Sequence, residues 1–393
     1  MPPLLSIDEA LGRVLARARP LAAEPVPVAA AAGRVLAEDV AARVDLPSFA
    51  SSAMDGFAVR AADVPGRLPI VFRIAAGLPA DRPLAPGEAM EISTGGAVPD
   101  GADAVVQIEV VVEADNIVEI ADPVAAGANV RPIGGDVRAG DALLEAGAVL
   151  GAAQVGALAA AGVAEVMCAR QPSVVVLSTG TELRAPGDEL GPGQIYESNG
   201  PMLAAAFTAA GAIVERIGPI TDDEESHRTA LVRGLAADVL VSSGGVSVGP
   251  HDLVRRILAE LGVEEDFWGV AVRPGKPLAF GSRGATLVFG LPGNPVSALV
   301  AVELFVRPAL LALQGATHPG PRYHAGRLAS VLRRNAARDD LVRARTRDDA
   351  GETVLEPLSG SSTVSPASSR VRARTRSSRA GFRRSADASR PAW

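Results

Sequence analysis

Residues 4–18 carry apolar side chains three and four positions apart, which is the spacing of one face of an amphipathic helix. Ser6 stands where such a helix begins, and Glu9 follows it in the position of a capping box. A proline-rich stretch at 20–27 interrupts the periodicity. The pattern therefore predicts one helix over 4–18. Its apolar face would comprise Ile7, Leu11, Val14 and Leu15.

Residues 46–135 have the pattern of a small all-β unit. Short runs of valine and isoleucine are interrupted by glycine, proline or aspartate about every ten residues, as in short strands joined by tight turns. The clearest candidate strands are 69–75, 104–113 and 117–120.

From about residue 172, strand-like runs alternate with helical segments. The expected strands are 173–178, 213–217, 239–242, 278–280 and 286–289. The expected helices are 200–210, 222–235, 252–261 and 295–313. Such alternation predicts an α/β unit with a parallel or mixed sheet and helices on both faces.

Charge and composition narrow the class of protein. The formal net charge of −7 is uneven, because residues 321–393 hold 16 arginines against seven acidic residues, so the remaining body is strongly acidic. An acidic body argues against nucleic acid as a partner. The single cysteine, Cys168, excludes a disulfide or thiolate metal cage within one chain. We expect a cytoplasmic protein without a membrane partner, since no run of eighteen uncharged apolar residues and no secretion signal is present.

The C-terminal segment has a different composition. Residues 359–393 contain ten serines, eight arginines and one acidic residue, Asp387. Such a segment cannot bury enough apolar surface to offset the entropy lost on ordering. We therefore expect a few strands within 321–358 and an incomplete C-terminal domain.

Three glycine-rich loops follow candidate strands of the α/β unit, at 178–182, 242–249 and 290–297. In open α/β sheets, ligands bind in the crevice outside the carboxyl ends of the strands. Glycine lets backbone N–H groups approach an anion, and a following helix adds favourable partial charge. One such loop alone is explained by a tight turn, whereas three at one sheet edge predict a phosphate or carboxylate ligand.

Four acidic residues, Glu182, Asp222, Asp223 and Asp252, are expected at the same edge. Helix N-capping is an alternative role, for Asp222 in particular. Carboxylates about 4 Å apart repel by roughly 4 kcal/mol at an effective dielectric constant of about 20, so convergent acids beside a phosphate favour a bridging cation. Oxygen ligands favour Mg²⁺. Zinc is disfavoured because the four histidines, His227, His251, His318 and His324, are scattered.

Lys276 is the only lysine among 38 basic residues, in the string Arg-Pro-Gly-Lys-Pro that begins at Arg273. A surface lysine would be the ordinary interpretation. In a chain that otherwise uses arginine, the compact ammonium group favours a tight anion site that a planar guanidinium does not fit.

The β-rich unit contributes three glycine-supported strings, 47–60, 92–96 and 134–136. They carry Asp55, Thr94 and Asp136, respectively. Each string alone is more simply a turn than a site.

Together these strings resemble the molybdopterin molybdenumtransferase family, which comprises the bacterial MoeA proteins and the gephyrin E domain. The resemblance covers about residues 5–320. The matching motifs, in the order of the family, are PSFASSAMDGFAVR, STGGAVPDGADAVV, VRPIGGDVRAGD, LSTGTEL, YESN, SSGGVSVGPHD, RPGKPLAFG and GLPGNPVS.

The resemblance implies a multidomain α/β fold and an elongated homodimer, in which the β-rich unit of the partner faces the pterin-binding cleft. The domains would be a linker domain (1–45 and 135–171), a β-rich lid (46–134), the α/β pterin-binding domain (172–320) and the altered C-terminal β domain (321–393). The implied activity is a Mg²⁺-dependent exchange in which adenylylated molybdopterin is cleaved, molybdate is inserted and AMP is released. Other proteins of molybdenum cofactor biosynthesis would be further partners.

The resemblance also carries residue roles. The implied catalytic groups are Asp55, Thr94, Asp136, Glu182, Asp222 and Lys276. The implied Mg²⁺ ligands are Glu182, Asp222 and Asp252. The implied phosphate and pterin contacts are Gly180, Ser243, Gly244, Gly245, Ser247, Asp252, Arg273, Pro292, Gly293, Asn294, Pro295 and Ser297.

The chain departs from the family at two places. Gly269 and Arg273 stand where many members have lysines, which implies weaker or differently arranged molybdate binding. The similarity fades after about Ser362, where the family continues with apolar strands. We interpret the tail as the product of a reading-frame change, or else as a genuine disordered extension; translating the other frames of the coding DNA distinguishes the two.

Two alternative functions remain from the sequence. A molybdopterin adenylyltransferase also has a loop of the SSGG type, but the β-rich unit and the SAMDG string disfavour it. A catalytically impaired pterin-binding scaffold is the second alternative, which the gephyrin resemblance allows.

Overall fold

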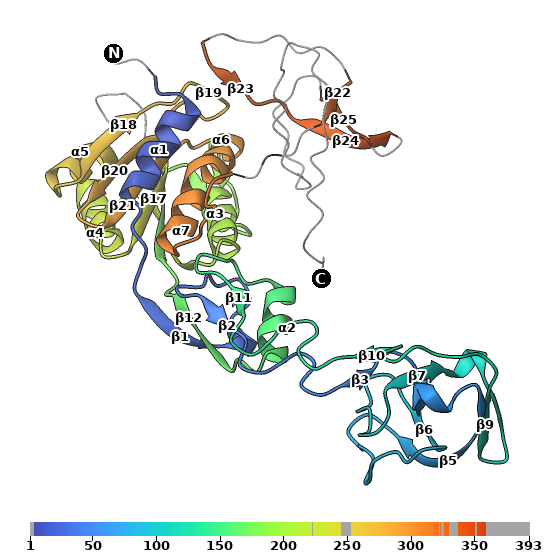
Figure 1. Cartoon of the computed structure of the whole chain (residues 1–393). Coiled ribbons are helices and arrows are strands. Elements are labelled where there is room, and N and C mark those ends of the chain that lie inside the picture. The colour runs from blue at the N-terminus through green and yellow to red at the C-terminus, as the bar shows by residue number, and fades with distance from the viewer. Residues whose placement is uncertain are drawn as a thin grey trace.

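The computed structural model describes residues 4–221, 223–244, 253–321, 323, 326–329, 337–349 and 352–358. Figure 1 shows an α/β unit at one end, a small linker unit beside it and a β-rich unit at the far end. Short C-terminal strands lie next to the α/β unit.

The α/β unit is built on a six-stranded mixed sheet in the order β16-β13-β17-β21-β20-β18. The first four strands are parallel, and the last two are antiparallel to their neighbours. The bounds are β13 Ser173–Thr179, β16 Ile213–Ile220, β17 Val239–Ser243, β18 Glu264–Trp268, β20 Ala279–Arg283 and β21 Thr286–Leu291. The predicted α/β class with a mixed sheet is therefore confirmed.

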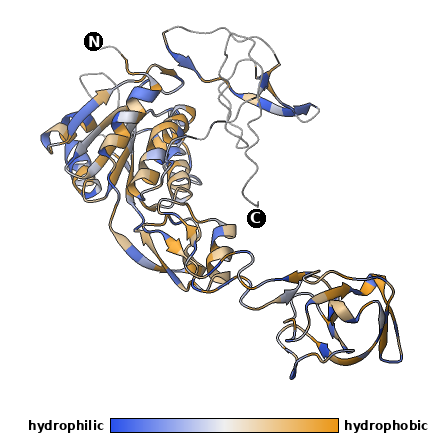
Figure 2. Ribbon diagram, viewed as in Figure 1, coloured by the Kyte–Doolittle hydropathy of each residue, from blue (hydrophilic) through white to orange (hydrophobic). Residues whose placement is uncertain are grey.

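Helices cover both faces of this sheet because side chains along a strand alternate between its two faces. Val239 and Val241 of β17 pack with α1, α3 and the helix from Pro295 to Leu313. Leu240 packs on the opposite face with α4 and α5. Figure 2 shows the apolar residues concentrated between these layers. The bounds are α1 Ile7–Arg17, α3 Asn199–Thr208, α4 Glu224–Gly234, α5 Leu253–Glu260, α6 Pro295–Ala301 and α7 Arg307–Leu313.

Helix α1 confirms the predicted capping box but not the predicted place in the molecule. The Glu9 amide donates to Ser6 Oγ (3.2 Å), and the Ser6 amide donates to the Glu9 carboxylate (2.8 Å). Its buried residues Ile7, Ala10 and Val14 belong to the core of the α/β unit. The helix therefore belongs to the α/β unit, whereas the division drawn from the sequence assigned it to the linker with the rest of 1–45.

The helix from Pro295 to Leu313 is continuous but contains one π-helical turn at Val302–Val306. Pro308 has no N–H group to donate to the carbonyl of Leu304, which explains a change of hydrogen-bonding pattern at this point. This helix is long and apolar enough to cross a membrane by length and composition. However, 56% of its apolar window is buried within the protein, so it packs as a core helix.

The linker unit has its own small core around Leu36, Leu158 and Cys168. Hydrogen bonds at Asp238 of the α/β unit form a joint between the two units. The Asp238 carboxylate accepts from Arg170 Nη1 (2.7 Å) and Nη2 (2.6 Å), just after the linker unit, and from the Ser173 amide (2.8 Å) at the start of β13. The elements of the linker unit are β1 Ala23–Pro27, a 3-10 helix Val28–Ala30, β2 Val40–Ala41, β11 Ala142–Leu144, α2 Ala152–Ala160 and β12 Glu165–Ala169.

The β-rich unit contains a six-stranded sheet in the order β7-β4-β6-β5-β9-β8, with hydrophobic cores against both faces. The predicted strand 104–113 is interrupted, because a 3-10 helix at Ile108–Val110 separates β7 from β8. The bounds are β3 Ser51–Ser52, β4 Gly56–Val59, β5 Gly66–Ile74, β6 Ala89–Ile92, β7 Ala104–Gln107, β8 Val112–Ala114, β9 Ile117–Ile120 and β10 Val130–Arg131, with a second 3-10 helix at Ala61–Asp63.

The C-terminal segment supplies a few strands, as predicted. They are mostly hydrophilic in Figure 2, and only Val354 and Leu355 among them are buried. The bounds are β22 Arg327–Leu328, β23 Asp339–Asp340, β24 Ala344–Asp349 and β25 Glu352–Pro357, and β23 pairs with β19 Val272–Arg273 of the α/β unit. The Arg/Ser-rich tail lies outside the described residues.

Candidate functional site

The three glycine loops begin side by side at the carboxyl edge of the sheet. In the register of the parallel strands, Ser178 of β13 lies opposite Ser243 of β17, and Ser243 lies opposite Leu291 of β21. The described parts of the three loops, 178–182, 242–244 and 290–297, therefore share one rim, which we call the glycine rim. On its outer side, Thr179 lies opposite Ile220 at the end of β16.

Two positions of the rim require glycine. Gly180 has φ +146° and Gly244 has φ +93°, a region that side-chain-bearing residues rarely adopt. A Cβ on Gly244 would lie 3.1 Å from Thr179 Oγ1, and its amide donates to the Leu291 carbonyl (3.1 Å). The first loop thus packs directly on the second, and the second is tied to the third.

Asn199, at the start of α3, connects the second and third loops. Its Nδ2 donates to Ser243 Oγ and to the Gly293 carbonyl, both at 2.8 Å. Asn199 is 9% exposed, and its Oδ1 is buried without a hydrogen-bond partner among the described residues. The Asn199 amide therefore sets the spacing between two loops of the rim.

The YESN string also contributes Glu197, which is 7% exposed. Its Oε1 accepts from the Gly200 amide (2.6 Å), which holds the first turn of α3 against the rim. Neither Glu197 nor Asn199 was among the predicted site residues. The sequence signal that could have identified both residues was the YESN motif, which stands at the start of a helix that faces two glycine loops.

The third loop ends in a capped helix. Asn294 Oδ1 accepts from the amides of Val296 (3.1 Å) and Ser297 (3.2 Å), and Pro295 has no amide hydrogen. The cap thus uses the Ser297 amide that an anion would otherwise contact. Of the predicted contacts in this loop, Gly293 and Asn294 are exposed, whereas Pro295 and Ser297 are half-buried, and the Ser297 hydroxyl donates to Asn294 Oδ1 (3.5 Å).

Lys276 lies beside this third loop. A Cβ on Gly275 would lie 3.6 Å from the Ser297 carbonyl, so the loop that contains Lys276 packs against the start of α6. The Lys276 carbonyl accepts from the amides of Val270 and Leu278, both at 3.0 Å, which fixes the backbone. The side chains of Lys276 and Arg273 are exposed and form no ion pair with any described residue. Two positive charges therefore remain available to an anion next to the rim.

Two of the predicted acidic residues, Glu182 and Asp223, are described, and they make different contacts. The Glu182 carboxylate folds over Gly180, where a Cβ would lie 2.6 Å from its Oε2. Asp223 caps α4: its carboxylate accepts from the Ser226 amide (2.8 Å) and from Thr221 Oγ1 (2.6 Å). These hydrogen bonds, Thr221 first, lower the pKa of Asp223 to about 2.

Four predicted site residues, Asp222, Gly245, Ser247 and Asp252, lie outside the described residues. Among the residues that are described, no group of three or more histidine, cysteine, aspartate or glutamate side chains could hold a metal. Of the three implied Mg²⁺ ligands, only Glu182 can be placed.

Asp55 directly precedes β4, Thr94 follows β6 and Asp136 follows β10. Figure 1 shows these strands in the β-rich unit, at the far end of the molecule from the α/β unit. Asp55 Oδ1 accepts from the Thr94 amide (2.6 Å) and from Thr94 Oγ1 (2.9 Å), and these bonds lower the pKa of Asp55. Asp136 pairs with Arg131 of β10. One chain thus carries two separate groups of predicted site residues.

Comparisons with known proteins give consistent matches. Residues 5–162 match the model of the MoeA N-terminal region (domain I and II), and residues 175–312 match that of a probable molybdopterin binding domain. The chain is 38% identical over 317 residues to a molybdopterin molybdenumtransferase of Haemophilus influenzae, covering 79% of this chain and 78% of that protein. It is 39% identical over 344 residues to molybdopterin molybdenumtransferase 2 of Mycobacterium tuberculosis, covering 84% of each. A solved structure of a molybdopterin biosynthesis moeA protein from Pyrococcus horikoshii superposes with a TM-score of 0.74 at 28% identity, covering 92% of each chain.

Proposed function

The chain belongs to the molybdopterin molybdenumtransferase family and is a transferase that inserts molybdate in molybdenum cofactor biosynthesis, and from this premise we propose that its substrate is adenylylated molybdopterin, which binds at the glycine rim and releases AMP. The observation that carries the proposal is the pair of hydrogen bonds donated by the Asn199 side chain. They hold Ser243 and Gly293, which belong to two different loops, at one edge of the sheet. A phosphoanhydride and a pterin need such a fixed set of amide and hydroxyl groups.

The residues of the rim have distinct roles in this proposal. Gly180 and Gly244 let the chain approach the phosphates closely, and their neighbouring amides stabilise the charge that develops on the leaving phosphate. Lys276 and Arg273 neutralise the anionic substrate and the incoming molybdate from the adjacent loop. Asn199 acts as a positioning residue.

We assign Mg²⁺ to Glu182, Asp222 and Asp252. Glu182 fits, because its exposed carboxylate lies at the rim and pairs with no described basic residue, and Mg²⁺ prefers carboxylate oxygens shared with substrate phosphate. When bound, Mg²⁺ would polarise the phosphoanhydride.

We further propose a cytoplasmic homodimer. Asp55 and Thr94 stand beside β4 and β6, and the β-rich unit that contains these strands lies at the far end of the molecule from the α/β unit (Figure 1). In a dimer, the β-rich unit of the partner would bring its own Asp55–Thr94 pair to the cleft, and the lowered pKa of Asp55 keeps that carboxylate charged.

The deciding experiment is turnover of purified adenylylated molybdopterin with Mg²⁺ and molybdate. AMP release that depends on molybdate supports the transferase. Adenylylation of the pterin with ATP would instead identify an adenylyltransferase, and binding without turnover would identify a scaffold. Glu182→Ala should abolish AMP release while leaving the circular dichroism spectrum unchanged.

A further inference from the structure

A cavity of about 260 Å³ lies on the α5 face of the sheet, opposite the face that carries Asn199. It is lined by Ser242 of β17 and Gly290 of β21, each one residue before the rim positions Ser243 and Leu291. The cavity therefore opens next to the glycine rim without using the side chains assigned to it.

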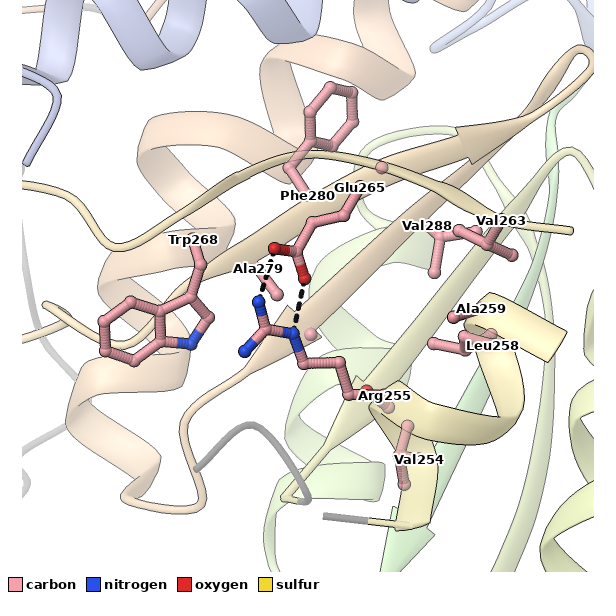
Figure 3. A pocket seen from close by; sticks show the side chains of 13 residues that line it. Val254, Arg255, Leu258, Ala259, Val263, Glu265, Trp268, Ala279, Phe280 and Val288 are labelled. Atoms are coloured by element: carbon pink, nitrogen blue, oxygen red, sulfur yellow. Dashed lines mark hydrogen bonds and ion pairs between the residues drawn. The ribbon is translucent and has the colours of Figure 1, made fainter. Parts of the chain in front are cut away.

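The walls of this cavity are mostly apolar. Val254 and Leu258 come from α5, and Val288 comes from the sheet. Figure 3 shows these residues on one side and the indole of Trp268 on the other, with the ion pair between Arg255 and Glu265 between them. Sites for whole drug-sized ligands measure about 300–1,000 Å³, so the smaller cavity fits one ring system rather than a complete nucleotide.

Ser242 is the unexplained group in this cavity. It is 2% exposed, and its hydroxyl has no hydrogen-bond partner within the described part of the chain. Because side chains alternate along β17, Ser242 points to the face opposite Ser243. Native proteins pair nearly all buried polar atoms, so the hydroxyl is suited to a partner that enters the cavity.

The charges at the mouth are already matched. Arg255 Nε and Nη2 donate to the two carboxylate oxygens of Glu265 at 2.7 and 2.6 Å, and both side chains are about half exposed. The cavity thus suits a neutral, flat ring, which can stack on the indole or the guanidinium plane. A pterin has more hydrogen-bonding groups on its edge than one hydroxyl can satisfy, whereas a purine places fewer polar atoms in an apolar wall.

We propose that this cavity receives the purine base of the adenylylated substrate, with the Ser242 hydroxyl hydrogen-bonded to the base and the phosphate on the glycine rim. This inference rests on the proposed function, because it assigns the base of that same substrate. The pterin then lies outside the cavity, along the polar side of the rim.

Trp268 provides the test. The chain has two tryptophans, so full-length protein with Trp393→Phe leaves Trp268 as the only one. AMP should quench its fluorescence saturably, and ribose 5-phosphate, followed by calorimetry, should bind without quenching. Ser242→Ala should weaken AMP binding about fivefold, as expected for one lost hydrogen bond.

Ala279→Leu fills the cavity from the sheet side and should weaken AMP binding more than Ser242→Ala does. Neither variant should change the affinity for ribose 5-phosphate. Ala114→Leu, on the exposed strand β8, is the matched control and should bind AMP as the parent does. Thermal unfolding of each variant verifies the fold.

Unchanged AMP affinity in Ala279→Leu, or quenching by a free pterin but not by AMP, would overturn the assignment of the base. The parent protein is assayed in parallel for molybdate-dependent AMP release. Turnover combined with unchanged AMP binding in Ala279→Leu refutes the cavity alone. Quenching by AMP without any turnover refutes the proposed function alone.

Discussion

Replacing Asn199 with alanine tests the central geometric argument. The substitution removes two hydrogen bonds of 2.8 Å, to Ser243 Oγ and to the Gly293 carbonyl. A neutral hydrogen bond contributes about 1 kcal/mol net, so the loss is about 2 kcal/mol. The substitution also removes the buried, unpaired Asn199 Oδ1, and this gain offsets part of the lost stability. In a domain of this size, 2 kcal/mol lowers the Tm by roughly 4–8 °C.

The substitution should also lower the activity of the protein that remains folded. Without the amide, the loops at Ser243 and Gly293 are no longer held at a fixed spacing. Displacing a catalytic group by about 1 Å can cost a factor of about 100. We therefore expect kcat/KM for molybdate-dependent AMP release to fall at least about tenfold at a temperature where the variant is folded.

Gln314 offers a matched control in the same domain. Its buried amide also donates two hydrogen bonds, here to the backbone carbonyls of Ala210 (2.9 Å) and Leu310 (3.0 Å), and its Oε1 is also unpaired among the described residues. It lies at the end of α7, away from the rim. Gln314→Ala should lower the Tm by a similar amount and leave kcat/KM unchanged. Equal losses of activity in the two variants would show that Asn199 acts only through stability.

Three further perturbations test other parts of the molecule. Lys276→Arg should raise KM about tenfold although the charge is kept, because a guanidinium does not replace a compact ammonium at a tight anion site; an unchanged KM in steady-state assays would contradict this. Asp238→Asn should lower the free energy of unfolding in urea by about 2 kcal/mol, after allowance for the exposure of Arg170; a difference below about 0.5 kcal/mol would refute the joint between the units. The pKa of Asp223 is about 2 in the folded protein and roughly 3.9 in the unfolded chain. The charged carboxylate therefore stabilises the fold fully above about pH 3.9, and this stabilisation is lost as the pH falls toward about 2. The Tm difference between Asp223→Asn and the parent should therefore shrink from about pH 5 to about pH 2, and a constant difference would contradict the assigned cause.

The alternation of strands and helices allowed the α/β unit to be predicted, but not all of its parts. Strand β18 was missed because its sequence, Glu-Glu-Asp-Phe-Trp, is mostly charged. It lies at the edge of the sheet, where charged residues are common since one side faces water. The place of α1 could not be predicted either, because an amphipathic pattern shows which face is buried and not which domain buries it.

The loops of the candidate site followed from the sequence, whereas the contacts between them did not. Ser243 and Gly293 lie 44 and 94 residues after Asn199, and no local pattern reports so distant a hydrogen bond. The cap of α4 is a local example: the sequence offers two adjacent aspartates, and only the backbone geometry selects Asp223.

Ser242 and Ser243 are neighbours on one strand, yet they face opposite layers of the molecule. Deleting a single residue of β17 before Ser242 would move Ser243 to the α5 face and Gly244 to the face of Asn199, so that the Asn199 face would lose its hydroxyl in one event. The strand end therefore tolerates changes of residue type better than changes of length. Natural variation in this family should respect that spacing even where the side chains differ.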